Sequence, residues 1–189
     1  MFKLNSKNNF LNFTFLLLIL FSIVSFSCKS SKSLVKLPYE TIPIPPEVTE
    51  LPVIEYTGVG IRYEIEYMLL DRFVVMYDEE ASGNYCARLL DDGSTAKLKV
   101  KFHAGTYECL ISEKAFKTEN SAFYVYIDDV PYRVYPSTPP LGIWELTTRV
   151  PIYFTLDEPR TVLITIQANS PKKNGDTMMN LDYIQFVKR

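Results

Sequence analysis

The chain from about residue 57 onward alternates apolar and polar residues with a period of two. Residues 61–67 read IRYEIEY, residues 96–102 read AKLKVKF, and residues 162–168 read VLITIQA. This alternation is typical of β-strands that bury one face and leave the other in solvent. No window of a dozen residues shows a convincing period of 3.6, which a helix would require. The sequence therefore predicts an all-β domain over residues 57–189.

Short turn signals separate further candidate strands. These signals are DDG at 91–93, HAG at 103–105, PP at 139–140 and NG at 174–175. The remaining strands are expected near residues 72–77, 106–113, 122–128, 131–135, 145–155 and 181–187. Nine or ten short strands at this spacing favour an antiparallel β-sandwich.

The first 27 residues have the pattern of a secretory signal peptide. Lys3 and Lys7 precede a stretch, residues 13–24, that is apolar apart from one Thr and one Ser. A stretch of about 12 residues is too short to cross a hydrocarbon core of roughly 30 Å as a helix. A basic start followed by a short apolar run indicates export.

Cys28 directly follows this segment and resembles the cysteine of a bacterial lipobox, which is lipidated and becomes the new N-terminus. In an exported chain with three cysteines, at least one cysteine has no disulfide partner within the chain. A lipid on Cys28 leaves Cys86 and Cys109 as an even pair, which is either a disulfide or two buried thiols. The small residues Ser25 and Ser27 keep ordinary secretion open as the alternative.

Residues 28–56 are predicted to be a tether. They are rich in Ser and Lys at their start and contain five prolines, a composition that favours extended chain. The expected organisation is therefore a signal peptide over 1–27, a lipid-anchored tether over 28–56 and a sandwich over 57–189.

The charged and metal-binding residues exclude several classes of function. The formal net charge is -2, so the chain lacks the basic field of a nucleic-acid-binding protein. One histidine and three cysteines rule out most zinc clusters. That histidine, His103, lies in a predicted turn, and no phosphate-binding glycine loop or nucleophile elbow occurs. The chain is predicted to be non-catalytic.

Six motifs in order resemble the family 6 and family 35 carbohydrate-binding modules. They are YEIEY at 63–67, ASGNY at 81–85, GSTAKLKVKFHAGTYECLISEKA at 93–115, the strand at 123–129, Trp144, and NLDYIQF at 180–186. The resemblance covers nearly all of residues 60–187. It implies a jelly-roll sandwich of the galactose-binding-like type.

The resemblance also implies a structural Ca²⁺ at the edge of the sandwich. Its ligands would be Glu64 and Glu66 of the first strand and Asp182 of the last, because Ca²⁺ prefers six to eight hard oxygen ligands. Glu64 and Glu66 are two apart, so on a strand they share one face. The alternative is that both lie on the solvent face and bind no metal.

The sugar-binding residues implied by the resemblance are Tyr85, Trp144 and Asn180. Sugars pack a C–H face on aromatic rings, and their hydroxyls need directional amides or acids. Each residue has a structural alternative: Tyr85 as a half-buried strand residue, Trp144 as a core plug, and Asn180 as a cap of the last turn.

The predicted function is that of an exported lipoprotein whose sandwich binds carbohydrate at the bacterial cell envelope, on the periplasmic or surface side. The alternative is an adaptor lipoprotein that docks an envelope protein with the same fold. A large exposed apolar patch of Tyr124, Tyr126, Tyr132 and Tyr135 would favour a protein partner. A polar pocket around an exposed Trp144 and Tyr85 would favour a sugar.

Overall fold

The computed structural model describes residues 43–117, 122–169 and 179–189. The predicted signal peptide and Cys28 lie outside the described residues. Residues 42–189 form one compact unit. In the described part of the chain, no helix is long and apolar enough to cross a membrane.

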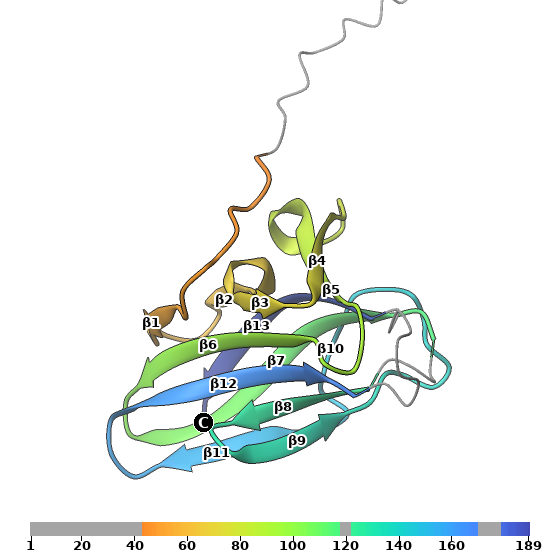
Figure 1. Cartoon of the computed structure of the whole chain (residues 1–189). Coiled ribbons are helices and arrows are strands. Elements are labelled where there is room, and N and C mark those ends of the chain that lie inside the picture. Colours follow the sequence, from red (N-terminus) through yellow and green to blue (C-terminus); the bar gives the residue numbers. More distant parts are fainter. Residues whose placement is uncertain (1–42, 118–121, 170–178) are drawn as a thin grey trace, which may run out of the picture. The chain divides into compact units, whose positions relative to one another are not determined.

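The described residues form two facing β-sheets (Figure 1). In the first sheet, hydrogen-bonded neighbours follow the order β1-β6-β12-β8-β9, and β3 pairs with β6 beside β1. Its strands are β1 (Val53–Glu55), β3 (Leu69–Asp71), β6 (Thr95–Phe102), β8 (Phe123–Ile127), β9 (Val130–Val134) and β12 (Arg160–Ala168). All pairs are antiparallel except β1 with β6.

The second sheet follows the order β10-β7-β13-β5-β4, with β11 also on β7 and β2 also on β13. Its strands are β2 (Arg62–Glu64), β4 (Phe73–Tyr77), β5 (Tyr85–Leu89), β7 (Gly105–Ala115), β10 (Glu145–Leu146), β11 (Ile152–Leu156) and β13 (Met179–Lys188). Every pair is antiparallel. Two such sheets confirm the predicted antiparallel β-sandwich.

The core lies between the sheets and is built by the alternation seen in the sequence. Along β6 the apolar residues of AKLKVKF are buried, whereas the lysines between them are half-buried or exposed. Aromatic rings fill one end of this core: the ring centroids of Phe102 and Tyr107 lie 4.7 Å apart, and those of Phe102 and Phe186 lie 5.0 Å apart. Burial of these rings is a main source of the stability of the fold.

The first strand of the sandwich precedes the predicted start at Thr57. Strand β1 runs parallel to β6, and the Lys99 N–H donates to the Pro52 carbonyl at 2.9 Å. Tyr56 follows β1 and is buried against Phe102, with ring centroids 5.7 Å apart. The C-terminal end of the proline-rich segment is therefore part of the sheet.

The alternating stretch 61–67 is not one strand. Strand β2 ends at Glu64, and Ile65–Tyr67 forms the 3-10 turn η1, which the Met68 N–H closes on the Ile65 carbonyl at 3.0 Å. Ile65 and Met68 both lie in the core. Residues three apart point to opposite faces of a strand but to the same side of a 3-10 turn, which explains the change of structure. The prediction that Glu64 and Glu66 share a strand face was wrong.

The expected strand at 145–155 is divided into β10 and β11. Both pair with β7, and residues 147–151 leave the ladder between them. Pro151 lies in this break, where it has no N–H to donate to a ladder. The break closely follows Trp144, which directly precedes β10.

The two described cysteines are free and buried. Cys86 lies on β5 and Cys109 on β7, and β13 separates these strands. Two strand spacings amount to roughly 9–10 Å, which exceeds the span of about 7 Å that a disulfide can bridge. Of the two alternatives drawn from the sequence, the structure has the free thiols.

We expect both thiols to react very slowly with a thiol reagent in the native protein. Burial raises the pKa of Cys86 to about 12, and burial also raises the pKa of Cys109. The thiolate is the reactive form, so little of either thiol is reactive at neutral pH. Labelling of residues 42–189 with Ellman's reagent should be slow when folded and complete in denaturant. Rapid labelling under native conditions would contradict the buried placement.

Candidate functional site

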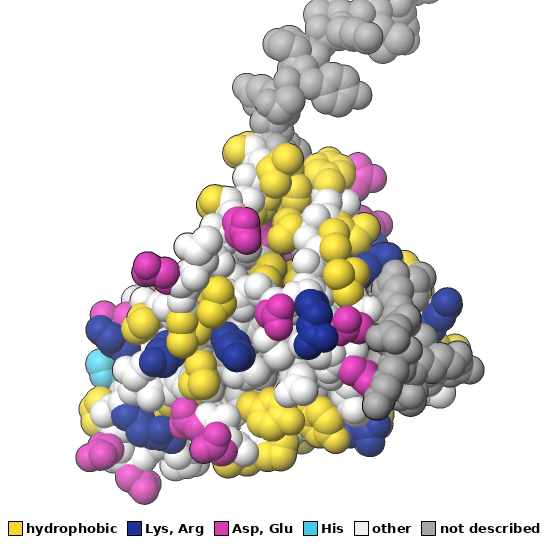
Figure 2. Space-filling view, in the orientation of Figure 1, with side chains coloured by type: hydrophobic (Ala, Val, Ile, Leu, Met, Phe, Trp, Pro, Cys, Tyr) yellow, Lys and Arg dark blue, Asp and Glu magenta, His cyan; other side chains and the backbone are white. Residues whose placement is uncertain are grey.

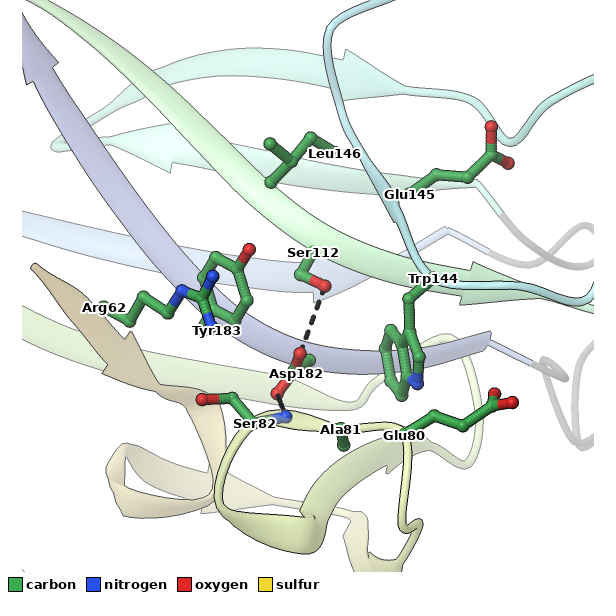
Figure 3. A pocket seen from close by; sticks show the side chains of 10 residues that line it. All are labelled: Arg62, Glu80, Ala81, Ser82, Ser112, Trp144, Glu145, Leu146, Asp182 and Tyr183. Carbon is green, nitrogen blue, oxygen red and sulfur yellow. Dashed lines mark hydrogen bonds between the residues drawn. The ribbon is translucent and has the colours of Figure 1, made fainter. Parts of the chain in front are cut away.

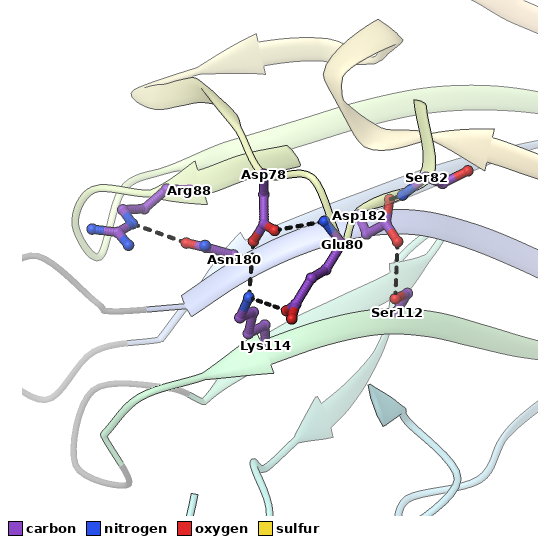
Figure 4. Close-up of polar contacts among 8 residues, drawn as sticks. All are labelled: Asp78, Glu80, Ser82, Arg88, Ser112, Lys114, Asn180 and Asp182. Carbon is purple, nitrogen blue, oxygen red and sulfur yellow. Dashed lines mark hydrogen bonds and ion pairs between the residues drawn. The ribbon is translucent and has the colours of Figure 1, made fainter. Parts of the chain in front are cut away.

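Polar side chains gather on the face of the second sheet that points away from the core. Asn180 alternates on β13 with the core residues Met179 and Leu181, and its register partners are Arg88 on β5 and Lys114 on β7. Directly opposed residues of neighbouring strands project to the same side of a sheet. Figure 4 shows this row, with Asp182 farther along β13.

Three carboxylates, those of Glu64, Glu66 and Asp182, lie near one another next to this row. Asp182 is buried; its Oδ1 accepts from the Ser82 N–H at 2.9 Å and its Oδ2 accepts from the Ser112 hydroxyl at 3.2 Å. The Ser82 hydroxyl donates to Glu64 Oε1 at 2.7 Å. Glu66, from η1, is buried as well. Ser82 thus links Glu64 on β2 to Asp182 on β13.

The loop that supplies Ser82 passes close to Glu66. Gly83 has a φ of +64°, and a Cβ at this position would lie 3.8 Å from Glu66 Oε1. Glycine adopts this left-handed backbone without strain. The left-handed turn brings the chain around Ser82, so the ASGNY motif positions the loop over the carboxylates.

Burial and neighbouring carboxylates raise the pKa of two of these acids, Glu66 and Asp182. Burial, followed by the charges of Glu64 and Asp182, raises the pKa of Glu66 to about 7. Burial and the charge of Glu64 raise the pKa of Asp182 to about 6, against the lowering effect of its hydrogen bonds from Ser82 and Ser112. Ionising all three groups therefore costs free energy, which a nearby cation would offset.

The donor set fits a hard cation, because every candidate atom is an oxygen. Glu64 Oε2 and Glu66 Oε2 are buried and have no hydrogen-bond partner in the structure. Such atoms carry a desolvation cost that metal coordination would remove. As placed, no group of three or more His, Cys, Asp or Glu side chains in the described residues could hold a metal ion.

Lys114 lies between two acids at the other end of the row. Its Nζ donates to Asp78 Oδ2 at 3.0 Å and to Glu80 Oε2 at 2.9 Å. Burial lowers the pKa of Lys114, but the bonds to Glu80 and Asp78 outweigh this effect and raise it. The ammonium also lies 5.4 Å from the ring centroid of Trp144, within range of a cation–π contact.

Trp144 forms one wall of a pocket of about 340 Å³ beside the carboxylates. Figure 3 shows Trp144 and Glu80 at one end, Arg62 and Tyr183 at the other, and Asp182 between Ser82 and Ser112. Trp144 is half-buried, and its indole Nε1 is buried without a hydrogen-bond partner in the structure. The pocket therefore combines two aromatic side chains, Trp144 and Tyr183, with hydroxyl, carboxylate and guanidinium groups.

The segment that carries Trp144 is fastened to β7 on both sides. Before it, the Gly142 N–H donates to the Ala115 carbonyl at 3.0 Å. After it, Thr147 exchanges two hydrogen bonds with Ile111, both at 2.9 Å. These bonds position the indole against the sheet.

Arg149 closes the base of the same segment. Its guanidinium donates to the Tyr135 carbonyl, contacts Glu145, and pairs with the buried Glu113. Burial raises the pKa of Glu113 to about 7, although Arg149 acts in the opposite direction. The loop from 135 to 149 is thus closed by an ion-pair network.

The structure brings some of the predicted residues together and separates others. Glu64, Glu66 and Asp182 form one cluster, and Trp144 shares a pocket with Asp182. Tyr85 is buried in β5 against Tyr77, with ring centroids 5.9 Å apart, and does not line this pocket. Asn180 is buried outside the pocket and accepts from Arg88 Nε at 2.9 Å. Their roles in binding stay predictions.

Several residues of the site were not predicted from the sequence. Ser82 lies in the ASGNY motif at residues 81–85, but nothing in the sequence around Ser112 and Lys114 indicates a role in binding. Lys114 is 36 positions from Asp78 and 34 from Glu80. Only the strand register brings such residues together.

Comparison with known proteins finds likeness in structure alone. No protein-family model matches the sequence. No curated protein matches it either.

Three solved structures share the fold. A family 35 carbohydrate-binding module from Clostridium thermocellum has a TM-score of 0.52 at 17% identity, with 68% of this chain covering 98% of the module. An uncharacterised Listeria monocytogenes protein, solved with glucose, magnesium and calcium, has a TM-score of 0.54 at 18% identity over 67% of this chain. A Podospora anserina β-(1,4)-mannanase with a family 35 module has a TM-score of 0.54 at 16% identity over 68%.

This chain spans 12% of the Listeria protein and 27% of the mannanase, so it matches one part of each. The match to the isolated module covers nearly all of that module. The sandwich therefore has the fold of a family 35 carbohydrate-binding module, as the motif order predicted.

Proposed function

We propose that this chain binds carbohydrate in the pocket walled by Trp144. The observation that carries the proposal is the half-buried indole beside a row of hydroxyl and carboxylate groups. An aromatic wall accepts the C–H face of a sugar ring, and Ser82, Ser112 and Glu80 offer partners for its hydroxyls. The Listeria protein, which shares this fold over one part of its length, was solved with glucose, and this supports the proposal.

We propose further that Ca²⁺ draws Glu64, Glu66 and Asp182 together as a structural site. The raised pKa values of Glu66 and Asp182 and the two unpartnered oxygens support this assignment. Bound calcium would supply the positive charge that these buried carboxylates lack. It would also join the start of the domain to its last strand.

The adaptor alternative is less well supported. Of the four tyrosines that would form an apolar docking patch, only Tyr135 is exposed, whereas Tyr124, Tyr126 and Tyr132 are half-buried. The hydroxyl of Tyr132 is also bonded to the Tyr153 carbonyl at 2.7 Å. We therefore give carbohydrate binding as the proposed function.

We propose that the protein is a lipoprotein of the bacterial cell envelope, anchored through Cys28. Cys28→Ser in the full chain should move the protein from the membrane to the soluble fraction, because a peptide anchor without acyl chains has little membrane affinity. Ser30→Ala serves as the matched control and should stay with the membrane. Unchanged fractionation of Cys28→Ser would contradict lipidation.

The function itself is tested with a glycan array. Residues 42–189 should bind at least one class of glycan in the presence of Ca²⁺. A blank array from well-folded protein would contradict the proposal and favour the adaptor.

A further inference from the structure

Two glutamates lie opposite each other next to Trp144. Glu145, the first residue of β10, is the register partner of Glu113 on β7. Directly opposed residues project to the same side of a sheet, and like charges in this position weaken the pairing of their strands. Only 1% of the Glu113 side chain is exposed, so solvent screens this repulsion poorly. The pairing of β10 with β7 therefore needs a positive charge at this point.

Arg149 supplies this charge. Its Nη2 pairs with Glu113, and its Nη1 lies 3.6 Å from Glu145 Oε1. The same guanidinium donates to the Tyr135 carbonyl, from Nε at 3.3 Å and from Nη2 at 3.1 Å. The Ser137 hydroxyl also donates to Glu145, at 2.8 Å, but carries no charge. Arg149 thus bridges the two opposed carboxylates and joins them to the start of the loop.

The neighbouring cation does not take over this role. Lys114 follows Glu113 on β7 and therefore projects to the opposite face of the sheet. There its ammonium is bonded to Asp78 and Glu80, at 3.0 and 2.9 Å. The charge that faces Glu113 is that of Arg149.

Trp144 directly precedes β10, so the position of its indole depends on how that two-residue strand is held. Figure 3 shows the indole and the Glu145 side chain leaving this segment in opposite directions, as successive residues of an extended chain do. Arg149 therefore holds the segment on one side while the indole forms the pocket wall on the other.

We propose that Arg149 is a positioning residue for Trp144: by bridging Glu113 and Glu145, its guanidinium keeps β10 on β7 and holds the indole in place as the pocket wall. The inference rests on the proposed carbohydrate function, since the indole is the surface on which a sugar would stack. A wall that is ordered before the ligand arrives loses less conformational entropy on binding.

The emission of Trp144, the only tryptophan, tests this role without any sugar. The test uses residues 42–189, one compact unit that holds both sheets. In Arg149→Gln, the emission should shift to longer wavelength and acrylamide should quench it more strongly, because a released indole meets more water. Arg149→Lys keeps a cation near the carboxylates and should retain most of the native spectrum.

The pH profile separates the charge of Arg149 from its bulk. Burial raises the pKa of Glu113 to about 7, the charge of Glu145 acts in the same direction, and Arg149 opposes both. In Arg149→Gln the ionised fraction of Glu113 grows with pH, so the disturbance of the indole should be larger at pH 9 than at pH 6. Adding Glu113→Gln removes the repulsion, so at pH 9 the double variant should be closer to the native spectrum than the single variant.

Arg160→Gln is the matched control. Arg160 pairs with Asp128 at 2.7 Å on the first sheet, away from the loop of Trp144. Figure 2 shows basic and acidic side chains interspersed over that sheet, and exposed ion pairs of this kind contribute little to stability. The control should keep the native emission and quenching at both pH values.

Sugar affinity gives the second readout. With the glycan selected on the array, Arg149→Gln should raise the dissociation constant about tenfold, and Arg160→Gln should leave it unchanged. A native chain that binds no glycan would contradict the proposed function, but the spectra would still decide the role of Arg149.

Melting curves establish that each variant is folded. Native emission and quenching in folded Arg149→Gln at both pH values would overturn the proposal. If Arg149→Gln does not fold, the double variant decides: a native spectrum at pH 9 supports the bridging role, and a disturbed spectrum overturns it. A disturbance at pH 9 that is equal in the single and double variants would also overturn it.

Discussion

Trp144→Ala should abolish carbohydrate binding at ordinary ligand concentrations. Removing the indole takes away the larger of the two aromatic side chains, Trp144 and Tyr183, that line the pocket with Asp182. Loss of a central aromatic contact costs about 2 kcal/mol or more, which is roughly 30-fold in the dissociation constant. Isothermal titration with the glycan identified on an array measures the change.

The controls separate stacking from folding. Trp144→Phe keeps a smaller ring and should retain part of the affinity. Tyr67→Ala removes an exposed aromatic residue that does not line this pocket and should bind normally. Native affinity in a folded Trp144→Ala variant would contradict the assignment of the pocket.

Removal of Ca²⁺ should lower the melting temperature of residues 42–189 substantially. A ligand at 100 times its dissociation constant stabilises the folded state by about 2.7 kcal/mol. For a domain of this size, that corresponds to a fall of roughly 5–10 °C. Differential scanning calorimetry with and without a chelator measures the difference.

The calcium effect should depend on pH in a defined direction. The folded pKa values of Glu66 and Asp182 are raised, so without metal these groups contribute stability at low pH that is lost as the pH rises through about 6 and 7. Calcium binds the ionised forms, so its stabilisation grows over the same range. The gap between the two melting curves should widen from pH 5 to pH 8.

Paired variants test which carboxylates are responsible. Asp182→Asn should remove the response to Ca²⁺, whereas Glu79→Gln, a change at an exposed acid outside the cluster, should keep it. Glu113 has a raised pKa too, but its contribution is the same with and without metal. A melting temperature indifferent to chelator and to added Ca²⁺ would contradict the site.

The period-two pattern predicted the sandwich because it records which side of each strand faces the core. It wrongly predicted a strand at residues 65–67. There the chain forms a 3-10 turn, which places both Ile65 and Met68 in the core. A local sequence pattern cannot predict this turn, because the turn depends on packing against the opposite sheet. The division of β10 from β11 has a similar tertiary origin.

The candidate site was predicted in part. The motif resemblance selected Glu64, Glu66 and Asp182, and the structure places these acids close enough that the charge of Glu64 helps to raise the pKa of Glu66 and of Asp182. Resemblance alone could not place Asn180, whose side chain turns to Arg88, 92 positions away in sequence. Contacts between residues so far apart in the sequence depend on the strand register, and a short sequence motif cannot predict them.

The emission of Trp144 is the most direct test that a sugar sits in the proposed pocket. Trp144 is the only tryptophan of the chain, so its fluorescence reports on that wall alone. Titration of residues 42–189 with the glycan selected on the array should shift or quench this emission with the same dissociation constant that calorimetry gives. Calorimetric binding that leaves the tryptophan spectrum unchanged would place the ligand elsewhere and contradict the proposed site.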